Sequence, residues 1–209
     1  EVAALHRGFS NYTQQKYRNA PMWELPIGLK AELPDTILFC DPSHICGNTE
    51  LLSYISQKAI DLNMDGLMLE THINPKSAWT DAKQQLDPNG LMKLLKNLQP
   101  RRNSSSNEQF VSKLEVLREE IDGIDNEIIL QMAKRMKLVE QIGEFKKDNE
   151  VTILQVNRWN EIIANRLNLG TALNLSDKFL NRLLNLIHQE SISVQTRIMN
   201  ASTIHSNQS

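Results

Sequence analysis

Two cations in the second half of the chain lie where an apolar side chain is expected. Arg135 falls in a series of apolar residues spaced by three and four, and Lys146 follows eleven residues later. At about 100° per residue, the two side chains point to nearly the same side of a helix. Burying unpaired charge is costly, so such cations are usually paired or used. Arg118 lies about 100° away around the helix, so we expect it to serve the pocket of a second copy.

Three more polar residues extend this group. Ser191 and Gln195 are four residues apart on one face of a predicted helix, and Arg158 lies on the helix before it. Each residue alone is well explained as part of a solvated helix surface, where long cations extend their charge into water. The cations together with Arg158, Ser191 and Gln195 are less easily explained as a helix surface. Their shared register indicates a ligand-binding or catalytic site.

In the first half, a histidine and two carboxylates follow predicted strands. His44 comes just after the run Ile37-Leu38-Phe39-Cys40-Asp41, Glu70 ends the run 66–70, and Asp81 lies in the loop beyond. In parallel α/β folds, ligands gather at the carboxyl ends of the strands. Imidazole and carboxylates can bind a divalent metal ion, so these residues form a candidate metal site. The alternative is that they are ordinary capping and loop residues.

Alternating strands and helices position these side chains. Short apolar runs between breakers predict buried strands, and a helical pattern follows each of them. The predicted elements are a helix over 26–32, a strand over 37–41, a helix over 50–62, a strand over 66–70 and a helix over 88–98. Parallel strands need a crossover, so this order predicts a parallel sheet or part of a barrel, with too few units to close a barrel of eight.

A polar linker over 99–109 separates a predicted first domain, 1–98, from a second, 110–200, and a disordered tail is predicted over 201–209. In the second domain, helices are predicted from about 110 to 148, from 153 to 167 with an end near Gly170, and from 176 to 199. The first, at ~38 residues, would be about 57 Å long. That is too long for a compact single-chain core and predicts a homodimer through this helix.

Composition narrows the class of protein. The formal net charge of -2 and the lack of a basic arm argue against a nucleic-acid partner. No apolar run approaches the ~20 residues that span a bilayer, so no membrane partner is expected. Cys40 and Cys46 are interpreted as structural, in a reducing, cytoplasmic setting. Because the chain begins at Glu1 without a methionine, we expect a piece of a longer polypeptide.

Residues 114–195 resemble the all-helical chorismate mutase family throughout. The matching text is Leu117-Arg118-Glu119-Glu120-Ile121-Asp122, Ala133-Lys134-Arg135, Ile142-Gly143-Glu144-Phe145-Lys146, Arg158, Gly170 and Glu190-Ser191-Ile192-Ser193-Val194-Gln195. The resemblance implies an isomerase that rearranges chorismate to prephenate with no cofactor and no covalent intermediate. Such a reaction requires placed charges and a confined substrate.

The resemblance also implies roles for these residues. Arg135, Arg158 and Arg118 of the partner subunit would hold the two carboxylates of chorismate. Lys146 and Gln195 would bond the ether oxygen, on which negative charge develops as its C–O bond breaks.

The remaining positions of this site include two departures from the family pattern. Ser191 would lie beside the carboxylate sites. Gln155 stands where an Asp is common, and we keep it among the substrate-binding positions. Trp159 stands where a Glu usually receives the ring hydroxyl of the substrate, so that contact is altered. Activity is expected because the cationic residues are intact.

Residues 1–98 resemble the last third of a 3-deoxy-D-arabino-heptulosonate-7-phosphate (DAHP) synthase. The matching text is His6-Arg7-Gly8-Phe9, Cys40-Asp41-Pro42-Ser43-His44, Asp65-Gly66-Leu67-Met68-Leu69-Glu70-Thr71-His72-Ile73-Asn74-Pro75 and Asp81-Ala82. That family condenses phosphoenolpyruvate with erythrose 4-phosphate in a (β/α)8 barrel. The resemblance implies that His44, Glu70 and Asp81 bind a divalent Mn, Fe, Zn or Co ion. It also implies that Arg7 helps to hold the phosphate of phosphoenolpyruvate.

The two resemblances together predict a multidomain, bifunctional enzyme of aromatic amino-acid biosynthesis. The expected fold is the C-terminal portion of a (β/α)8 TIM barrel followed by an all-α, three-helix mutase domain that dimerises. Mutase activity is expected, whereas the synthase lacks a metal-binding Cys and an active-site Lys that belong to earlier strands. The alternative is that the helical domain is a non-catalytic module that senses prephenate or chorismate and regulates the synthase.

Overall fold

The computed structural model describes residues 2–10 and 16–201. The chain divides into two compact units, Glu1–Asn107 and Glu108–Ser209. The domain limits predicted from the sequence are close to this division, although the helix of the second unit begins at Glu108, inside the predicted linker. The predicted disordered tail lies outside the described residues except for Ala201.

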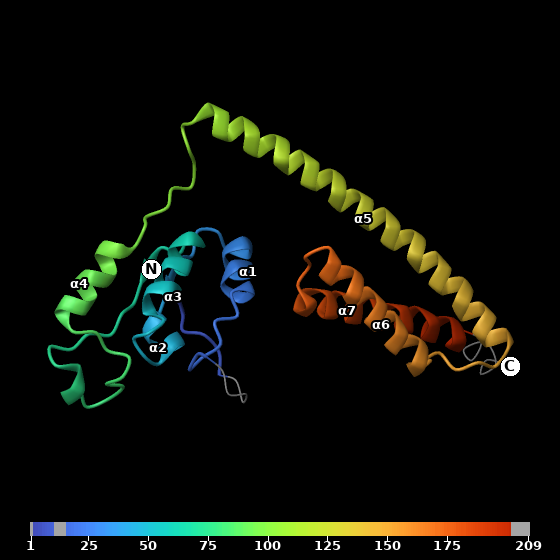
Figure 1. Cartoon of the computed structure of the whole chain (residues 1–209), viewed down its shortest axis with the longest axis horizontal. Helices are drawn as coiled ribbons and strands as arrows, with labels where there is room; N and C mark the ends of the chain where they lie inside the picture. Colours follow the sequence, from blue (N-terminus) through green and yellow to red (C-terminus); the bar gives the residue numbers. More distant parts are fainter. Residues whose placement is uncertain (1, 11–15, 202–209) are drawn as a thin grey trace. The chain divides into compact units, whose positions relative to one another are not determined.

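The first unit contains a small parallel sheet, and Figure 1 labels its helices α1 to α4. The strands β1 (Ala3–His6), β2 (Ile37–Cys40) and β3 (Gly66–Leu67) lie in the order β1-β2-β3. The other elements are α1 (Glu24–Glu32), α2 (Pro42–Cys46), α3 (Leu52–Asp61), the 3-10 helix η1 (Pro75–Ser77) and α4 (Pro88–Asn97). The parallel sheet that the sequence predicts is thus present. β1 was not predicted, because Ala-Ala-Leu-His contains no β-branched residue and forms a strand only through its pairing with β2.

Side chains from β2, α2, α3 and α4 form the core of this unit. Its buried members are Cys40, Ile45, Cys46, Leu52, Ile55, Ala59 and Leu94. Both cysteines are free thiols, and burial raises the pKa of each to about 12. A thiol with such a pKa stays protonated at neutral pH, so both cysteines act as small apolar core residues.

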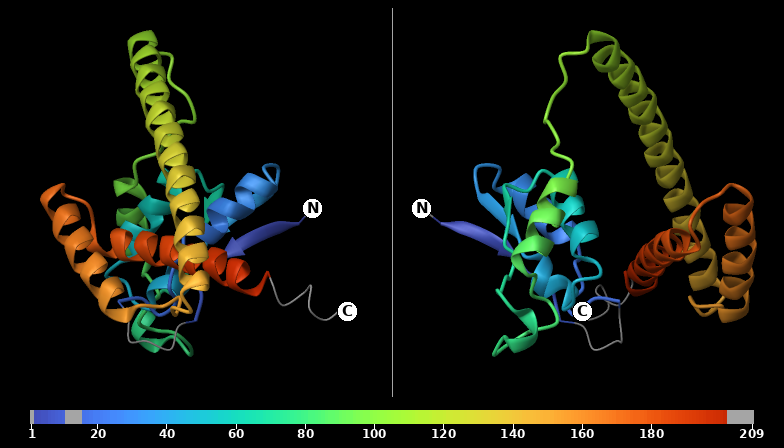
Figure 2. Two further views of the ribbon diagram at one scale, coloured as in Figure 1. Left: turned by 90° about the vertical axis from the view of Figure 1, so that its right-hand side faces the viewer. Right: turned by 60° about the vertical axis from the view of Figure 1, so that its left-hand side comes forward.

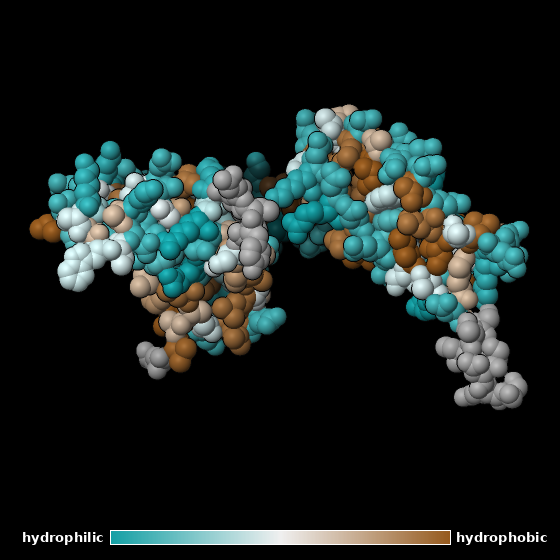
Figure 3. All heavy atoms as spheres, turned by 90° about the horizontal axis from the view of Figure 1, so that it is seen from below, coloured by the Kyte–Doolittle hydropathy of each residue, from teal (hydrophilic) through white to brown (hydrophobic). Residues whose placement is uncertain are grey.

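One face of the sheet carries apolar side chains that remain accessible. His6, Leu38 and Cys40 are buried, whereas the alternate residues Leu5 and Phe39, which pair across β1 and β2, are exposed. Figure 3 shows hydrophobic side chains gathered on one side of this unit. Within the part of the chain that the structure describes, Leu5 and Phe39 keep 40% and 36% of their surface accessible.

The second unit consists of three helices (Figure 1), α5 (Glu108–Asp148), α6 (Val156–Ala172) and α7 (Asp177–Asn200). Ser176 caps α7 by accepting a hydrogen bond from the backbone N–H of Phe179. The predicted end of this helix near Gly170 is confirmed, since α6 ends at Ala172. Gly170 is also a packing residue, because a Cβ at this position would lie 1.8 Å from Cδ1 of Leu180 on α7.

The long helix α5 packs against α7 through its C-terminal part alone, as both views of Figure 2 show. Val139 and Gly143 are buried there, and Gly143 allows Gln195 and Ile198 to approach. At 1.5 Å per residue, the 41 residues of α5 extend about 62 Å. Its N-terminal part exposes an apolar stripe, which we define as Leu117, Ile121, Ile124 and Ile128.

No helix among residues 2–10 and 16–201 is both long enough and apolar enough to cross a membrane.

Candidate active sites

A pocket of about 590 Å³ lies between α5, α6 and α7 in the second unit. Six of the seven mutase-site residues predicted from the sequence line it: Arg135, Lys146, Gln155, Arg158, Ser191 and Gln195. They come from all three helices and from the segment before α6, so the fold brings together residues separated by as many as sixty positions. The seventh, Arg118, lies outside this pocket and pairs with Glu115 on the exposed surface of α5, with 3.1 Å between Nη1 and Oε1.

Arg135 is held in the pocket by Ser191. Its Nη1 donates to Ser191 Oγ over 2.7 Å, and this hydroxyl donates to the carbonyl of Ile187, also over 2.7 Å. Desolvation by burial lowers the pKa of Arg135, yet an arginine remains charged at neutral pH. The guanidinium thus has a fixed position and no carboxylate partner in the described residues.

Lys146 on α5 and Gln195 on α7 both line the pocket. The Nζ of Lys146 donates to the carbonyl of Ile153, and desolvation by burial lowers the pKa of the lysine. Gln195 is buried and donates from Nε2 to the carbonyl of Ser191, while its Oε1 has no partner in the described residues. An unsatisfied buried polar atom costs about 1–3 kcal/mol, so this oxygen is suited to accept a hydrogen bond from a water or a ligand hydroxyl. The amide nitrogen carries two N–H groups, so Nε2 can donate to a ligand besides the carbonyl of Ser191.

The charge of the pocket has one sign. Arg135, Lys146, Arg158 and Arg166 line it, and no described residue among its lining carries a carboxylate. Arg158 pairs with Glu161, which lies outside the lining, over 3.2 Å. Four cations in a lining that has no carboxylate of its own favour a small ligand that carries more than one negative charge.

Two aromatic residues form part of the wall, and only one of them was expected. The rings of Trp159 and His188 stack with 3.7 Å between centroids and 13° between planes. Desolvation and the charge of Arg135 lower the pKa of His188. Sequence reasoning missed His188 and Arg166. His188 is three residues before Ser191 and Arg166 is seven after Trp159, so helical spacing could have indicated both.

A second candidate site lies at the carboxyl ends of the strands in the first unit. One ligand atom each of His44, Glu70 and Asp81 lies within 4.8 Å of the others, and His44 Nε2 is 3.4 Å from Glu70 Oε1. His44 Nδ1 lies 2.7 Å from Oδ2 of buried Asp41, which also lies 3.5 Å from Nε of Arg7. A carboxylate on Nδ1 orients an imidazole so that Nε2 can bind a metal. One nitrogen and two carboxylates so arranged fit a divalent transition metal ion.

Comparison with known protein families accounts for both units. The model of the DAHP synthetase I family matches residues 1–105, half of the chain. The chain belongs to the DAHP synthetase I family. The model of chorismate mutase type II matches residues 117–196, a range that includes all seven predicted mutase-site residues. The chain thus joins a DAHP synthetase part to a chorismate mutase type II domain, and the predicted resemblances are confirmed.

Curated relatives resemble one or the other part. The bifunctional chorismate mutase/prephenate dehydratase of Buchnera aphidicola subsp. Schizaphis graminum is 37% identical over 83 residues, 40% of this chain and 22% of the relative. The phospho-2-dehydro-3-deoxyheptonate aldolase of Thermotoga maritima is 30% identical over 88 residues, 42% of this chain and 25% of the relative. The chain therefore spans about a quarter or less of the length of these relatives.

Among solved structures, a truncated 3-deoxy-D-arabino-heptulosonate 7-phosphate synthase from Thermotoga maritima superposes with a TM-score of 0.39 and 26% sequence identity, over 45% of this chain and 35% of that one.

Proposed function

We propose that the second unit is an active chorismate mutase that converts chorismate to prephenate without a cofactor. The observation that carries this proposal is the convergence of Arg135 and Lys146 from α5, Arg158 from α6 and Gln195 from α7 on one pocket whose described lining has no carboxylate. Chorismate carries two carboxylates, and the cations that line the pocket have the opposite charge. The reaction is unimolecular, so a pocket that confines the substrate and stabilises developing charge is sufficient for catalysis.

In this mechanism the residues that line the pocket have two roles. Arg135, fixed by Ser191, and Arg158 hold carboxylates, and Gln155 lies beside them in the lining. Lys146 and Gln195 meet the ether oxygen as the C–O bond breaks. Their interaction strengthens as negative charge develops, so it stabilises the transition state more than the substrate.

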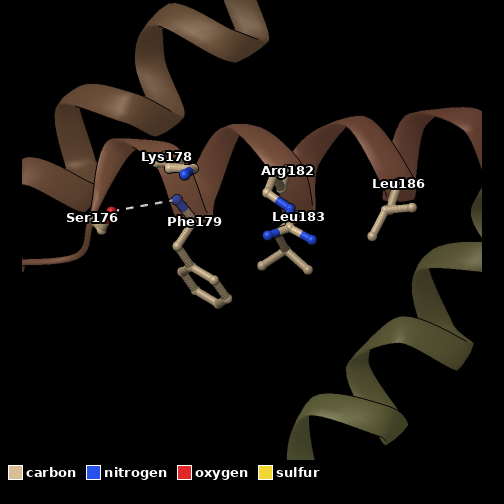
Figure 4. Close-up of a pocket in the computed structure, with 6 residues that line it drawn as sticks. All are labelled: Ser176, Lys178, Phe179, Arg182, Leu183 and Leu186. Carbon is tan, nitrogen blue, oxygen red and sulfur yellow. Dashed lines mark hydrogen bonds between the residues drawn. The ribbon is translucent and has the colours of Figure 1, made fainter. Parts of the chain in front are cut away.

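We further propose that a second copy of the chain completes the site. The apolar stripe of α5 is more than 45% exposed at each of its four residues. Figure 4 shows Phe179, Leu183 and Leu186 pointing to one side of α7, where they line an open groove with Lys178 and Arg182. Apolar faces of this size are usually covered by a partner. Arg118 does not line the mutase pocket of its own chain. In a two-fold dimer through α5, the partner's Arg118 would reach that pocket.

We propose that residues 1–98 are the C-terminal portion of the barrel of a synthase that condenses phosphoenolpyruvate with erythrose 4-phosphate. The exposed face of β1 and β2 supports this, since strands of a barrel bury side chains on both faces. His44, Glu70 and Asp81 would hold the divalent ion, which would act as a Lewis acid when bound. Arg7, half exposed beside Asp41, would bind the phosphate of phosphoenolpyruvate. We expect this chain by itself to catalyse no condensation.

A second candidate is that the helical unit senses chorismate or prephenate and regulates the synthase. Trp159 favours it, because the indole stacks on His188 in the wall where the family commonly has a carboxylate.

The loss of chorismate in the presence of the purified chain separates these two functions. We expect turnover, and we expect Lys146→Ala to lower kcat by about 10²–10³-fold because it removes a charge from the transition state. Lys137→Ala, at an exposed position on the same helix, is the matched control and should keep full activity. Binding of prephenate with no turnover of chorismate at high protein concentration would favour the sensor instead.

A further inference from the structure

The amide of Gln84 lies beneath the candidate metal site and is almost completely buried, with 1% of the residue exposed. Its Nε2 donates to Glu70 Oε2 over 2.8 Å, and its Oε1 accepts from Arg18 Nη1 over 2.9 Å. The same Arg18 nitrogen donates to Asp81 Oδ1 over 2.8 Å. Gln84 therefore connects two of the three candidate metal ligands, one directly and one through Arg18.

These contacts occupy one atom of each candidate ligand and leave another atom available to bind an ion. Gln84 occupies one oxygen of Glu70, and the other, Oε1, faces His44 Nε2 at 3.4 Å. Arg18 occupies one oxygen of Asp81. Asp41 similarly occupies Nδ1 of His44. Each ligand is thus held at one atom, and a second atom remains for an ion.

The side chain at position 84 must both donate and accept. Glu70 needs a donor at Oε2, and Arg18 needs an acceptor. A glutamine satisfies both from one uncharged group, whereas a glutamate in its place would repel Glu70. A backbone bond from Gln84 N–H to the carbonyl of Asp81, 3.0 Å long, ties this residue to the turn that carries the third ligand.

We propose that Gln84 is a positioning residue that fixes Glu70 as a one-oxygen ligand and, through Arg18, aligns Asp81, and so sets the affinity of the site for a divalent ion. This inference rests on the metal site of the proposed function. Gln84 does not itself contact the ion. It holds two carboxylates in place before the ion binds, which reduces the cost of ordering them.

The test is the affinity of the 209-residue chain for Mn²⁺, measured from the electron paramagnetic resonance of free Mn²⁺, together with the visible spectrum of the Co²⁺ form. Gln84→Met keeps the length of the side chain and removes both hydrogen bonds. We expect Mn²⁺ to bind about 10–100-fold more weakly and the Co²⁺ spectrum to change. Gln85→Met is the matched control, since the side chain of Gln85 donates to the backbone carbonyl of Thr80 and not to a candidate ligand. It should leave both readouts unchanged.

A second variant avoids the buried position. Arg18 is half exposed, so Arg18→Met is expected to fold and to weaken Mn²⁺ binding by releasing Asp81 and one side of Gln84. Unchanged Mn²⁺ affinity in both variants, with the chain folded by circular dichroism, would overturn the positioning role. If the unsubstituted chain binds no Mn²⁺, the metal site of the proposed function is itself wrong, and this inference is overturned with it.

Discussion

Burial lowers the pKa of both Arg135 and Lys146, since each side chain is partly removed from water between three helices. The two residues respond differently, because a guanidinium stays charged at any pH of interest whereas an ammonium can lose its proton. The proposed role of Lys146 requires the charged form. The lysine is therefore the residue through which pH should act on the mutase pocket.

We predict that kcat/KM for chorismate falls as the pH rises through the pKa of Lys146, which lies below that of an ordinary lysine. Protonated Lys146 dominates below this pKa, so activity is retained on the acid side and lost on the alkaline side. The measurement is a rate profile above about pH 8, where histidines are neutral. Lys146→Arg should move the loss of activity to higher pH, and an identical profile for this variant would contradict the assignment.

At the scale of the helices, Gly170 tests how α6 packs against α7, and Gly123 on α5 serves as its control. A Cβ at Gly170 would lie 1.8 Å from Leu180, whereas a Cβ at Gly123 on α5 meets no atom within 4 Å. We predict that Gly170→Ala lowers the free energy of unfolding by about 1–3 kcal/mol through overpacking. Gly123→Ala should raise it by up to about 1 kcal/mol through helix propensity. Urea denaturation followed by circular dichroism measures both, and equal effects would show that the helices do not pack as described.

The apolar stripe of α5 gives a second prediction at this scale. Ile121→Glu combined with Ile128→Glu places two charges in the proposed dimer interface, and we expect the chain to become monomeric. Asn126→Glu adds a charge on the opposite face of the same helix and should leave the dimer intact. Analytical ultracentrifugation distinguishes the two results. A monomeric unsubstituted chain would contradict the proposed dimer before any substitution is made.

At the scale of the whole molecule, a shared site predicts complementation between inactive variants. Arg118→Ala and Lys146→Ala should each lose most mutase activity. In a mixed dimer, one pocket has its own Lys146 and Arg118 of the partner subunit, while the other has neither. Random exchange makes about half of the dimers mixed, so an equal mixture should recover about a quarter of the unsubstituted activity. No recovery after the mixture is unfolded and refolded would mean that Arg118 does not act across the interface.

Local spacing along the chain determined which helix faces carry the mutase-site residues and which segments form the sheet. The angle between Arg135 and Lys146 and the four-residue step from Ser191 to Gln195 follow from helix geometry, so the sequence alone placed them on helix faces. The alternation of strands and helices likewise predicted the parallel sheet. The family motifs supplied the roles that these residues are proposed to have.

Contacts between distant segments were decided only by the tertiary structure. The bond between Gln84 and Glu70, the stack of His188 on Trp159 and the approach of Leu180 to Gly170 each join separate segments of the chain. Sequence periodicity specifies the direction of a side chain from its own helix or strand. It does not specify which element lies opposite, because that depends on how all the elements pack together. In the second unit, the sequence was therefore sufficient to identify the pocket residues, whereas the packing of the three helices determines that they converge.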